Sequence, residues 1–160
     1  MRCLSYVCLA FALLFNAPVS AQQLASGNPI LSVVKAGHPA IAFDREGLEK
    51  LPQHVVATST PWSSGVTRFE GPRLRDLLAS AGADGKTISA VAINDYKISL
   101  PVADAQKYDV IVAIKRDGAY MPVRDKGPLW IIYPLDSAAE LRNAETHAKM
   151  IWQLKSLVVD

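Results

Sequence analysis

Small hydroxyl side chains gather at one point of the sequence, directly after a β-branched run. The run HVVAT (54–58) ends at Thr58, and Ser59, Thr60 and Trp62 follow it. Hydroxyl groups beyond a strand can line a polar pocket, and an indole ring can serve as a platform for a ligand. The same residue types also form turns and caps, and tryptophan also packs over cores. A binding pocket and an ordinary turn both remain open as interpretations.

Metal binding and nucleophilic catalysis have little support in the sequence. His38, His54 and His147 lie far apart, without the spacing that is typical of a metal site. No GxSxG motif accompanies the serines, so we discard a serine hydrolase. Asn94 and Tyr96 flank an aspartate between two expected strands, where asparagine and aspartate more often form turns than contact ligands.

The first 21 residues have the layout of a cleaved secretory signal. Arg2 precedes an apolar stretch at 4–15, and small residues end at Ala21. We therefore expect cleavage after Ala21, a periplasmic or secreted location, and an N-terminal tail over 22–38 whose first part, 22–29, is loose. The apolar stretch is short for a membrane span, and no later segment is long and apolar enough to form one. Residues 39–160 are expected to form one domain.

Charge and cysteine usage narrow the classes of partner. The formal net charge is +2 at pH 7, and it falls to +1 if Arg2 leaves with the signal. There is no basic block, which argues against nucleic acid as a partner. Both cysteines, Cys3 and Cys8, lie inside the predicted signal. A processed chain would then have neither a disulfide nor a thiolate to offer a metal.

Two helices have clear signals in the sequence. One is expected at 44–51, with Asp44 as its N-cap. A second is expected behind Pro72, because Leu74, Leu77 and Leu78 follow a helical spacing. The segment 57–72 is thus predicted to join a strand to a helix, which is where loops often bind ligands.

The remaining segments are mostly strands, and they come in clusters. Strands are expected at 39–43, 54–58, 87–94, 97–100, 127–134 and 151–159. A hairpin is expected over 109–123, with Asp117 and Gly118 at its tip, and shorter helical segments at 101–108 and 137–150. Because strands outnumber helices and do not alternate strictly with them, the predicted class is α+β with mainly antiparallel or mixed sheets.

The order of these segments resembles a known family. It is similar to the oxidoreductase molybdopterin-binding domain, which sulfite oxidases and related molybdenum enzymes share, in the series VVATSTPW, FEGPRLRDLL, AINDYKISLP, IVAIKRDGAYMPVRDKGPLWIIYP and IWQLKSLVV. The resemblance extends from about Phe43 to Val159, and it is closest to short, exported, single-domain members. It implies the α+β, mainly antiparallel fold of that domain, and it makes molybdopterin the cofactor to consider.

The resemblance places a metal ligand in the hydroxyl-rich loop. In enzymes of the family, a cysteine thiolate holds molybdenum just after the strand that corresponds to 54–58. Placing Trp62 on the family's loop tryptophan puts that ligand at or near Thr58, where no cysteine stands. A hydroxyl is a poor substitute for a thiolate toward a soft, sulfur-preferring centre. We therefore expect this chain to ligate no molybdenum and to hold no cofactor.

A second departure affects the binding of anions. Where the family's enzymes carry a histidine-glycine-glycine-proline-leucine-arginine motif, this sequence has RDKGPLW (124–130), so Trp130 takes the place of arginine. A pterin phosphate or sulfite needs fixed cationic donors. Arg68, Arg73, Arg124 and Lys126 could supply them, and their convergence on the Thr58 loop would indicate an anion site.

Two hypotheses follow. The first is an exported, non-catalytic module that binds a small molecule, an anion, or a periplasmic or membrane-bound partner protein. The alternative is a subunit of a molybdopterin-dependent oxidoreductase that holds the cofactor without a protein thiolate. The candidate ligand-binding residues are Thr58, Ser59, Thr60, Trp62, Arg73, Asn94, Tyr96, Arg124, Lys126 and Gly127.

Overall fold

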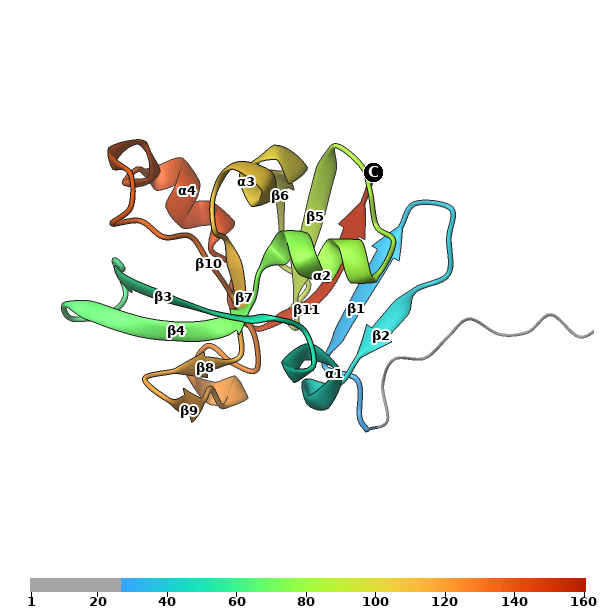
Figure 1. Cartoon of the computed structure of the whole chain (residues 1–160), viewed down its shortest axis with the longest axis horizontal. Helices are drawn as coiled ribbons and strands as arrows, with labels where there is room; N and C mark the ends of the chain where they lie inside the picture. Colours follow the sequence, from blue (N-terminus) through green and yellow to red (C-terminus); the bar gives the residue numbers. More distant parts are fainter. Residues whose placement is uncertain (1–26) are drawn as a thin grey trace, which may run out of the picture.

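Three β-sheets and several short helices make up residues 27–160, the part of the chain that this computed structural model describes (Figure 1). The largest sheet has the strand order β2-β1-β11-β5-β6. Its strands are β1 (Leu31–Lys35), β2 (Ile41–Phe43), β5 (Thr87–Ala92), β6 (Lys97–Pro101) and β11 (Leu154–Val159). Only the β1–β11 pair is parallel. The mixed α+β class predicted from the sequence is confirmed.

The second and third sheets lie beside the first. The second has the order β3-β4-β8-β9 and contains β3 (Gln53–Ser59), β4 (Val66–Pro72), β8 (Lys115–Arg116) and β9 (Ala119–Tyr120). The third consists of β7 (Ile111–Ala113) paired with β10 (Trp130–Ile132). The expected tight turn joins β8 to β9, and its residues Asp117 and Gly118 have φ angles of 49° and 81°. Such angles suit the short turns that join antiparallel strands.

The hydroxyl-rich loop differs from the expectation. It joins β3 to β4 in a hairpin that projects from the body of the molecule (Figure 1), so the predicted strand-to-helix junction is wrong. Residues 66–72 form a strand because alternate positions face the interior, with Thr67 and Phe69 buried. Gly71 continues this inward face, and a Cβ there would lie 2.0 Å from the carbonyl oxygen of Val112. The glycine thus allows close packing of two strands rather than the start of a helix.

The helices largely follow their sequence signals. Helix α1 (Arg45–Glu49) begins behind Asp44, whose side chain accepts a hydrogen bond from the backbone N–H of Gly47, as predicted. The predicted leucine face of α2 (Leu74–Ser80) is buried. Helix α3 (Val102–Lys107) follows β6, and α4 (Ala144–Lys149) begins at Asn143, which caps it through the N–H of Thr146. Two 3-10 helices complete the set, η1 (Val123–Asp125) and η2 (Ala139–Leu141).

The N-terminal segment contributes to the large sheet. Strand β1 lies inside the segment expected to be an N-terminal tail (22–38), beyond its expected loose part (22–29), and it pairs with both β2 and β11. Leu31 and Val33 are buried there, so residues 31–35 are part of the folded domain. The expected signal (1–21) lies outside the described residues. Over residues 27–160, no helix has the length and apolar character needed to cross a membrane.

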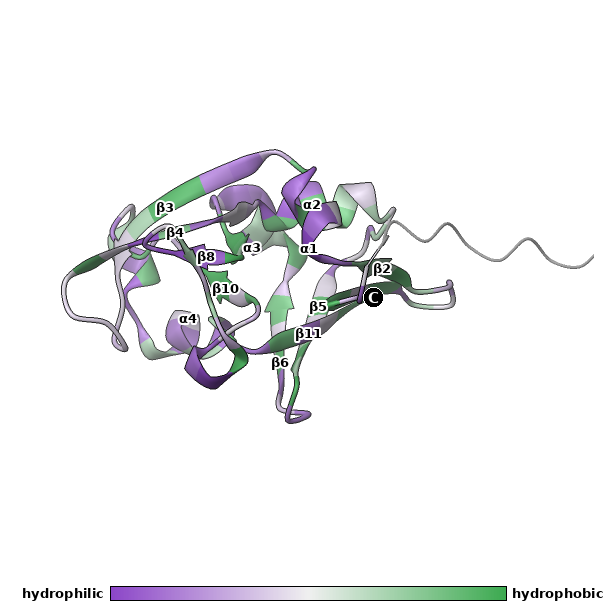
Figure 2. Cartoon of the chain, turned by 90° about the horizontal axis from the view of Figure 1, so that it is seen from below, coloured by the Kyte–Doolittle hydropathy of each residue, from purple (hydrophilic) through white to green (hydrophobic). Residues whose placement is uncertain are grey.

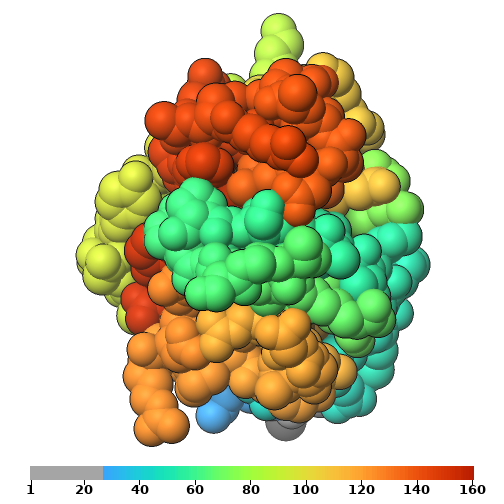
Figure 3. All heavy atoms as spheres, turned by 90° about the vertical axis from the view of Figure 1, so that its left-hand side faces the viewer, coloured from blue at the N-terminus to red at the C-terminus, as the bar shows by residue number. Residues whose placement is uncertain are grey.

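The core fills the space between the sheets. Phe43, Phe69, Trp130 and Tyr133 are among its largest fully buried side chains. Figure 2 shows hydrophobic stretches on inner strands such as β5 and β10, whereas α4 and the outer turns are largely hydrophilic. In Figure 3 the β3–β4 hairpin crosses one face of the molecule, with the segment that contains α4 on one side and the segment that contains β8 and β9 on the other.

Candidate functional site

The hydroxyl groups at the end of β3 bind another segment of the chain. Thr58 is fully buried, and its Oγ1 accepts a hydrogen bond from the backbone N–H of Asp136 at 3.1 Å. The backbone N–H and the hydroxyl of Ser59 donate to the two carboxylate oxygens of Asp136, at 2.6 and 2.7 Å. Arg142 donates to the same carboxylate at 3.3 Å. We call Thr58, Ser59, Asp136 and Arg142 the Asp136 latch, since it holds the hairpin against the segment that follows β10.

The electrostatics of the latch favour its ionised form. The backbone N–H of Ser59, followed by its hydroxyl and the charge of Arg142, holds the pKa of Asp136 below its ordinary value of 3.8. The next hydroxyl, of Thr60, forms a hydrogen bond with the Ser63 hydroxyl at 2.8 Å and accepts one from the N–H of Trp62 at 3.3 Å. All three candidate hydroxyl residues therefore have structural partners.

Trp62 lies in the hairpin loop and packs against other aromatic rings. Its ring centroid is 5.4 Å from that of Trp152, 5.8 Å from that of Trp130 and 6.1 Å from that of His147. Trp130 is buried, whereas Trp62 and Trp152 remain 36% and 38% exposed. Tilted and edge-to-face contacts of this kind fix the position of both exposed rings relative to the core.

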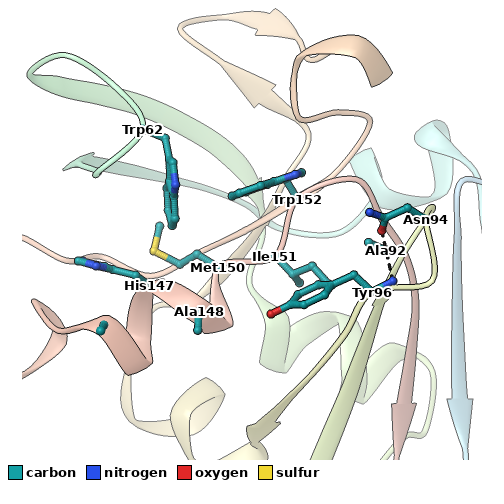
Figure 4. A pocket seen from close by; sticks show the side chains of 10 residues that line it. Trp62, Ala92, Asn94, Tyr96, His147, Ala148, Met150, Ile151 and Trp152 are labelled. Atoms are coloured by element: carbon teal, nitrogen blue, oxygen red, sulfur yellow. Dashed lines mark hydrogen bonds between the residues drawn. The ribbon is translucent and has the colours of Figure 1, made fainter.

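A pocket of about 480 Å³ opens beside this aromatic cluster. Trp62 reaches it from the hairpin, Asn94 and Tyr96 from the turn between β5 and β6, and His147 from α4 (Figure 4). The Oδ1 atom of Asn94 accepts the backbone N–H of Tyr96 at 3.2 Å, which fixes that turn. The complete lining is Trp62, Ala92, Asn94, Tyr96, Ala144, His147, Ala148, Met150, Ile151 and Trp152. The volume is within the range of small-molecule sites.

The four candidate cations are spread over the molecule. Arg68 is exposed on β4 opposite Ala57, one position from the Thr58–Thr67 pair. Along β4, Arg73 lies six residues beyond Thr67, which pairs with Thr58, so about 20 Å of strand separates Arg73 from the loop. It forms an ion pair with Asp109 at 3.0 Å. Arg124 is exposed in η1.

Lys126 is the candidate cation that meets the aromatic cluster. Its ammonium lies 5.1 Å from the centroid of the Trp152 ring and 5.7 Å from that of Trp130. Such distances give cation–π attraction. Gly127, beside it, is buried, and a Cβ there would lie 1.9 Å from the carbonyl oxygen of Met121, so this glycine is needed for backbone packing.

Three of the ten candidate residues thus line one pocket, namely Trp62, Asn94 and Tyr96, and Lys126 lies against one of its walls. His147 and Met150 were missed as lining residues, since neither belongs to a motif and α4 brings them to the hairpin only in the folded chain. Trp152 carried a signal, as an isolated tryptophan before the last strand, although that signal does not distinguish packing from binding. Within residues 27–160, no group of three or more His, Cys, Asp or Glu side chains is arranged to hold a metal ion.

Comparison with known proteins finds a match to one protein family. Residues 43–141 match the model of the oxidoreductase molybdopterin binding domain. No curated protein matches the chain at a significant level. The matched range includes the hairpin and the β5–β6 turn, whereas α4 and Trp152 lie beyond it.

Proposed function

Because the chain belongs to the oxidoreductase molybdopterin binding domain family, we propose that it keeps the family's fold as an exported, non-catalytic binding module. Its ligand site is the pocket between the β3–β4 hairpin, the β5–β6 turn and α4. The occupant is a small molecule or anion, and a periplasmic or membrane-bound partner protein is the alternative occupant. The observation that supports the proposal is the open, aromatic pocket beside Trp62, together with a buried hydroxyl in place of a thiolate at Thr58.

The donor set near Thr58 does not fit a molybdenum-pterin cofactor. The only cysteines of the sequence are Cys3 and Cys8, so residues 27–160 offer no thiolate. The Thr58 hydroxyl is buried and bonded to the backbone of Asp136, and it faces no open space. Molybdenum prefers sulfur ligands, and the phosphate of the pterin needs several fixed cations. Lys126 alone lies at the aromatic cluster, while Arg73 is paired elsewhere.

The alternative is a subunit of a molybdopterin-dependent oxidoreductase that holds the cofactor without a protein thiolate. The observation in its favour is the family match itself, which spans residues 43–141. A fold alone does not establish chemistry, however, because families often keep a scaffold after its reactive group is lost.

Metal and pterin analysis distinguishes the two functions. The protein is expressed with ample molybdate, beside a molybdenum enzyme of the same family as a positive control. Molybdenum is then measured by mass spectrometry, and the pterin by the fluorescence of its oxidised form. We expect neither in the purified protein, while the control contains both. Stoichiometric molybdenum or pterin would refute the binding-module proposal and support the oxidoreductase subunit.

Export is tested on the same preparation. We expect the protein in the periplasmic or secreted fraction, with Gln22 as its first residue by intact-mass analysis, since small residues precede the bond after Ala21. A cytoplasmic protein that retains residues 1–21 would refute export without affecting the ligand proposal.

A further inference from the structure

The pocket presents three hydrogen-bond donors without protein partners in residues 27–160, beside the Tyr96 hydroxyl and the His147 imidazole, which can both donate and accept. The indole N–H groups of Trp62 and Trp152 and the side-chain N–H₂ of Asn94 bond to no other described residue. The buried Trp130 is different, because its N–H donates to the carbonyl oxygen of Met150 at 2.9 Å. The acceptor of Asn94 is already used by the backbone of Tyr96. A ligand that supplies acceptors can therefore bond to all three of these donors, and it can also meet the Tyr96 hydroxyl and the His147 ring as donors.

The charge around the pocket also favours an acceptor. No Asp or Glu lines it. Lys126 lies over the Trp152 ring and has no carboxylate within ion-pair distance in the described part of the chain. Two nearby carboxylates are neutralised, since Asp125 pairs with Arg116 and Asp95 pairs with Lys155. The unbalanced charge at the Trp152 wall is therefore positive, and it attracts anions. At the opposite wall, α4, Lys149 is shared by Asp104 and Glu145, so an anion is expected at the Trp152 wall.

The walls of the pocket fit a flat, apolar body. Two indole rings, the Tyr96 phenol and the Met150 thioether provide most of the wide surfaces, and alanines leave room between them (Figure 4). Aromatic rings and thioethers contact other rings favourably, either stacked or edge-on. An aromatic cation would also suit indole faces, but the Lys126 ammonium already lies over one of them and would repel it.

From these three observations we infer that the pocket binds a planar aromatic carboxylate. The ring lies among Trp62, Trp152 and Tyr96, and the carboxylate accepts hydrogen bonds from the indole and amide donors while Lys126 balances its charge. This inference rests on the proposed function, because it requires a pocket free of the family's cofactor. It goes beyond that function in naming the chemical class of the ligand.

Four probe compounds separate the contributions of ring and charge. Benzoate has both the ring and the negative charge, benzamide lacks the charge, benzylamine reverses it, and cyclohexanecarboxylate lacks the flat ring. Each is titrated into the purified protein in the millimolar range, where ligands of this size are expected to bind. The readout is the set of indole N–H signals in ¹H–¹⁵N correlation spectra, one for each of the three tryptophans, assigned with Trp62→Phe and Trp152→Phe.

We expect benzoate to shift the Trp62 and Trp152 signals and to leave that of Trp130 in place, because only the first two donors are free. Benzoate should bind about fivefold more tightly than benzamide, the ratio that a partly exposed charge pair provides. Lys126→Gln should remove this preference while benzamide binding persists, which shows that the variant is folded. Lys86→Gln is the matched control, since Lys86 is an exposed lysine at the far end of β5, and it should keep the preference.

Several results would overturn the inference. Benzylamine or benzamide binding as tightly as benzoate would refute the role of charge, and cyclohexanecarboxylate binding as tightly would refute the flat ring. No shift of the two free indole signals with any ring compound would refute the site itself. These failures are distinct from failure of the proposed function, which is detected as molybdenum or pterin in the untreated protein.

Discussion

Replacing Thr58 by valine removes one hydroxyl group from the buried end of β3 and leaves the shape of the side chain almost unchanged. The hydroxyl accepts the backbone N–H of Asp136 at 3.1 Å, and no other acceptor for that N–H is seen among the described residues. Valine is as suitable as threonine in a strand. The substitution therefore tests one hydrogen bond of the Asp136 latch.

The expected loss follows from the burial of Thr58, which is 0% exposed. Leaving a buried donor without its acceptor destabilises a protein by about 1 to 3 kcal/mol. Since Asp136 itself lies at the surface, water can partly replace the lost acceptor, and we expect about 1.5 kcal/mol. For a folded unit of about 134 residues (160 minus 26), the entropy of unfolding is about 0.28 kcal/mol per kelvin, so the melting temperature should fall by about 5 °C.

Thr67→Val is the matched control. Thr67 faces Thr58 across the hairpin and is also buried, at 5%, but its hydroxyl bonds to no other described residue. Both variants then gain the same stability from the added methyl group, so the difference between their free energies of unfolding isolates the hydrogen bond. Urea unfolding gives the two free energies, and hydrogen exchange should show faster exchange of the Asp136 amide in Thr58→Val alone.

Equal stability of the two variants would refute this account of the latch. So would an unchanged exchange rate of the Asp136 amide, because that N–H would then have another partner. In either case the burial of the Thr58 hydroxyl would no longer be explained by this hydrogen bond.

Three further predictions concern the latch, the backbone and the pocket wall. The pKa of Asp136 lies below its ordinary 3.8, so the stabilisation from its carboxylate is fully present above about pH 4 and is lost as the pH falls through the lowered pKa. Carboxyl NMR measures the pKa, and acid unfolding should show that the difference in stability between wild type and Asp136→Asn shrinks in acid. Gly127→Ala should destabilise the protein by about 3 kcal/mol or more, because the alanine Cβ would overlap a backbone carbonyl. The loss should be seen as poor expression and a lowered melting temperature, and near-normal stability would contradict this packing. Asn143→Ala should lower the free energy of unfolding by about 1 kcal/mol through loss of the α4 cap, and unchanged helicity and stability would show that the cap contributes little.

Local signals in the sequence predicted much of the fold. The Asp44 cap, the leucine face of α2 and the Asp117–Gly118 turn all depend on residues close together in the chain, and each was confirmed. Strand β4 was missed although Thr67 and Phe69 alternate with exposed residues, because glycine followed by proline was taken as the opening of a helix. Strand β1 was missed because it is a strand through its pairing with β11 and β2, and this pairing is not visible in the sequence around it.

The candidate site depends on contacts that a sequence does not display. Trp62 and Trp152 are 90 positions apart (152 minus 62), and they meet because the hairpin and the segment before β11 both pack on Trp130. Conversely, Arg73 is close to Thr58 in sequence, but the extended β4 carries it to the other end of the hairpin. A strand is extended, so residues that are close in sequence along it lie far apart in space, and Arg73 therefore does not reach the hairpin loop.

The position of β11 has a consequence for the order in which the protein folds. Among the described strands it is the last in sequence, yet it lies in the middle of the five-stranded sheet, between β1 and β5. Before it is available, β1–β2 and β5–β6 are two separate strand pairs, and isolated pairs are marginally stable in water. Joining β1 to β11 brings Ser32 beside Ser156, across 124 positions (156 minus 32), and closing such a loop is slow. The large sheet therefore cannot be completed until β11 (Leu154–Val159) is available to join its two strand pairs.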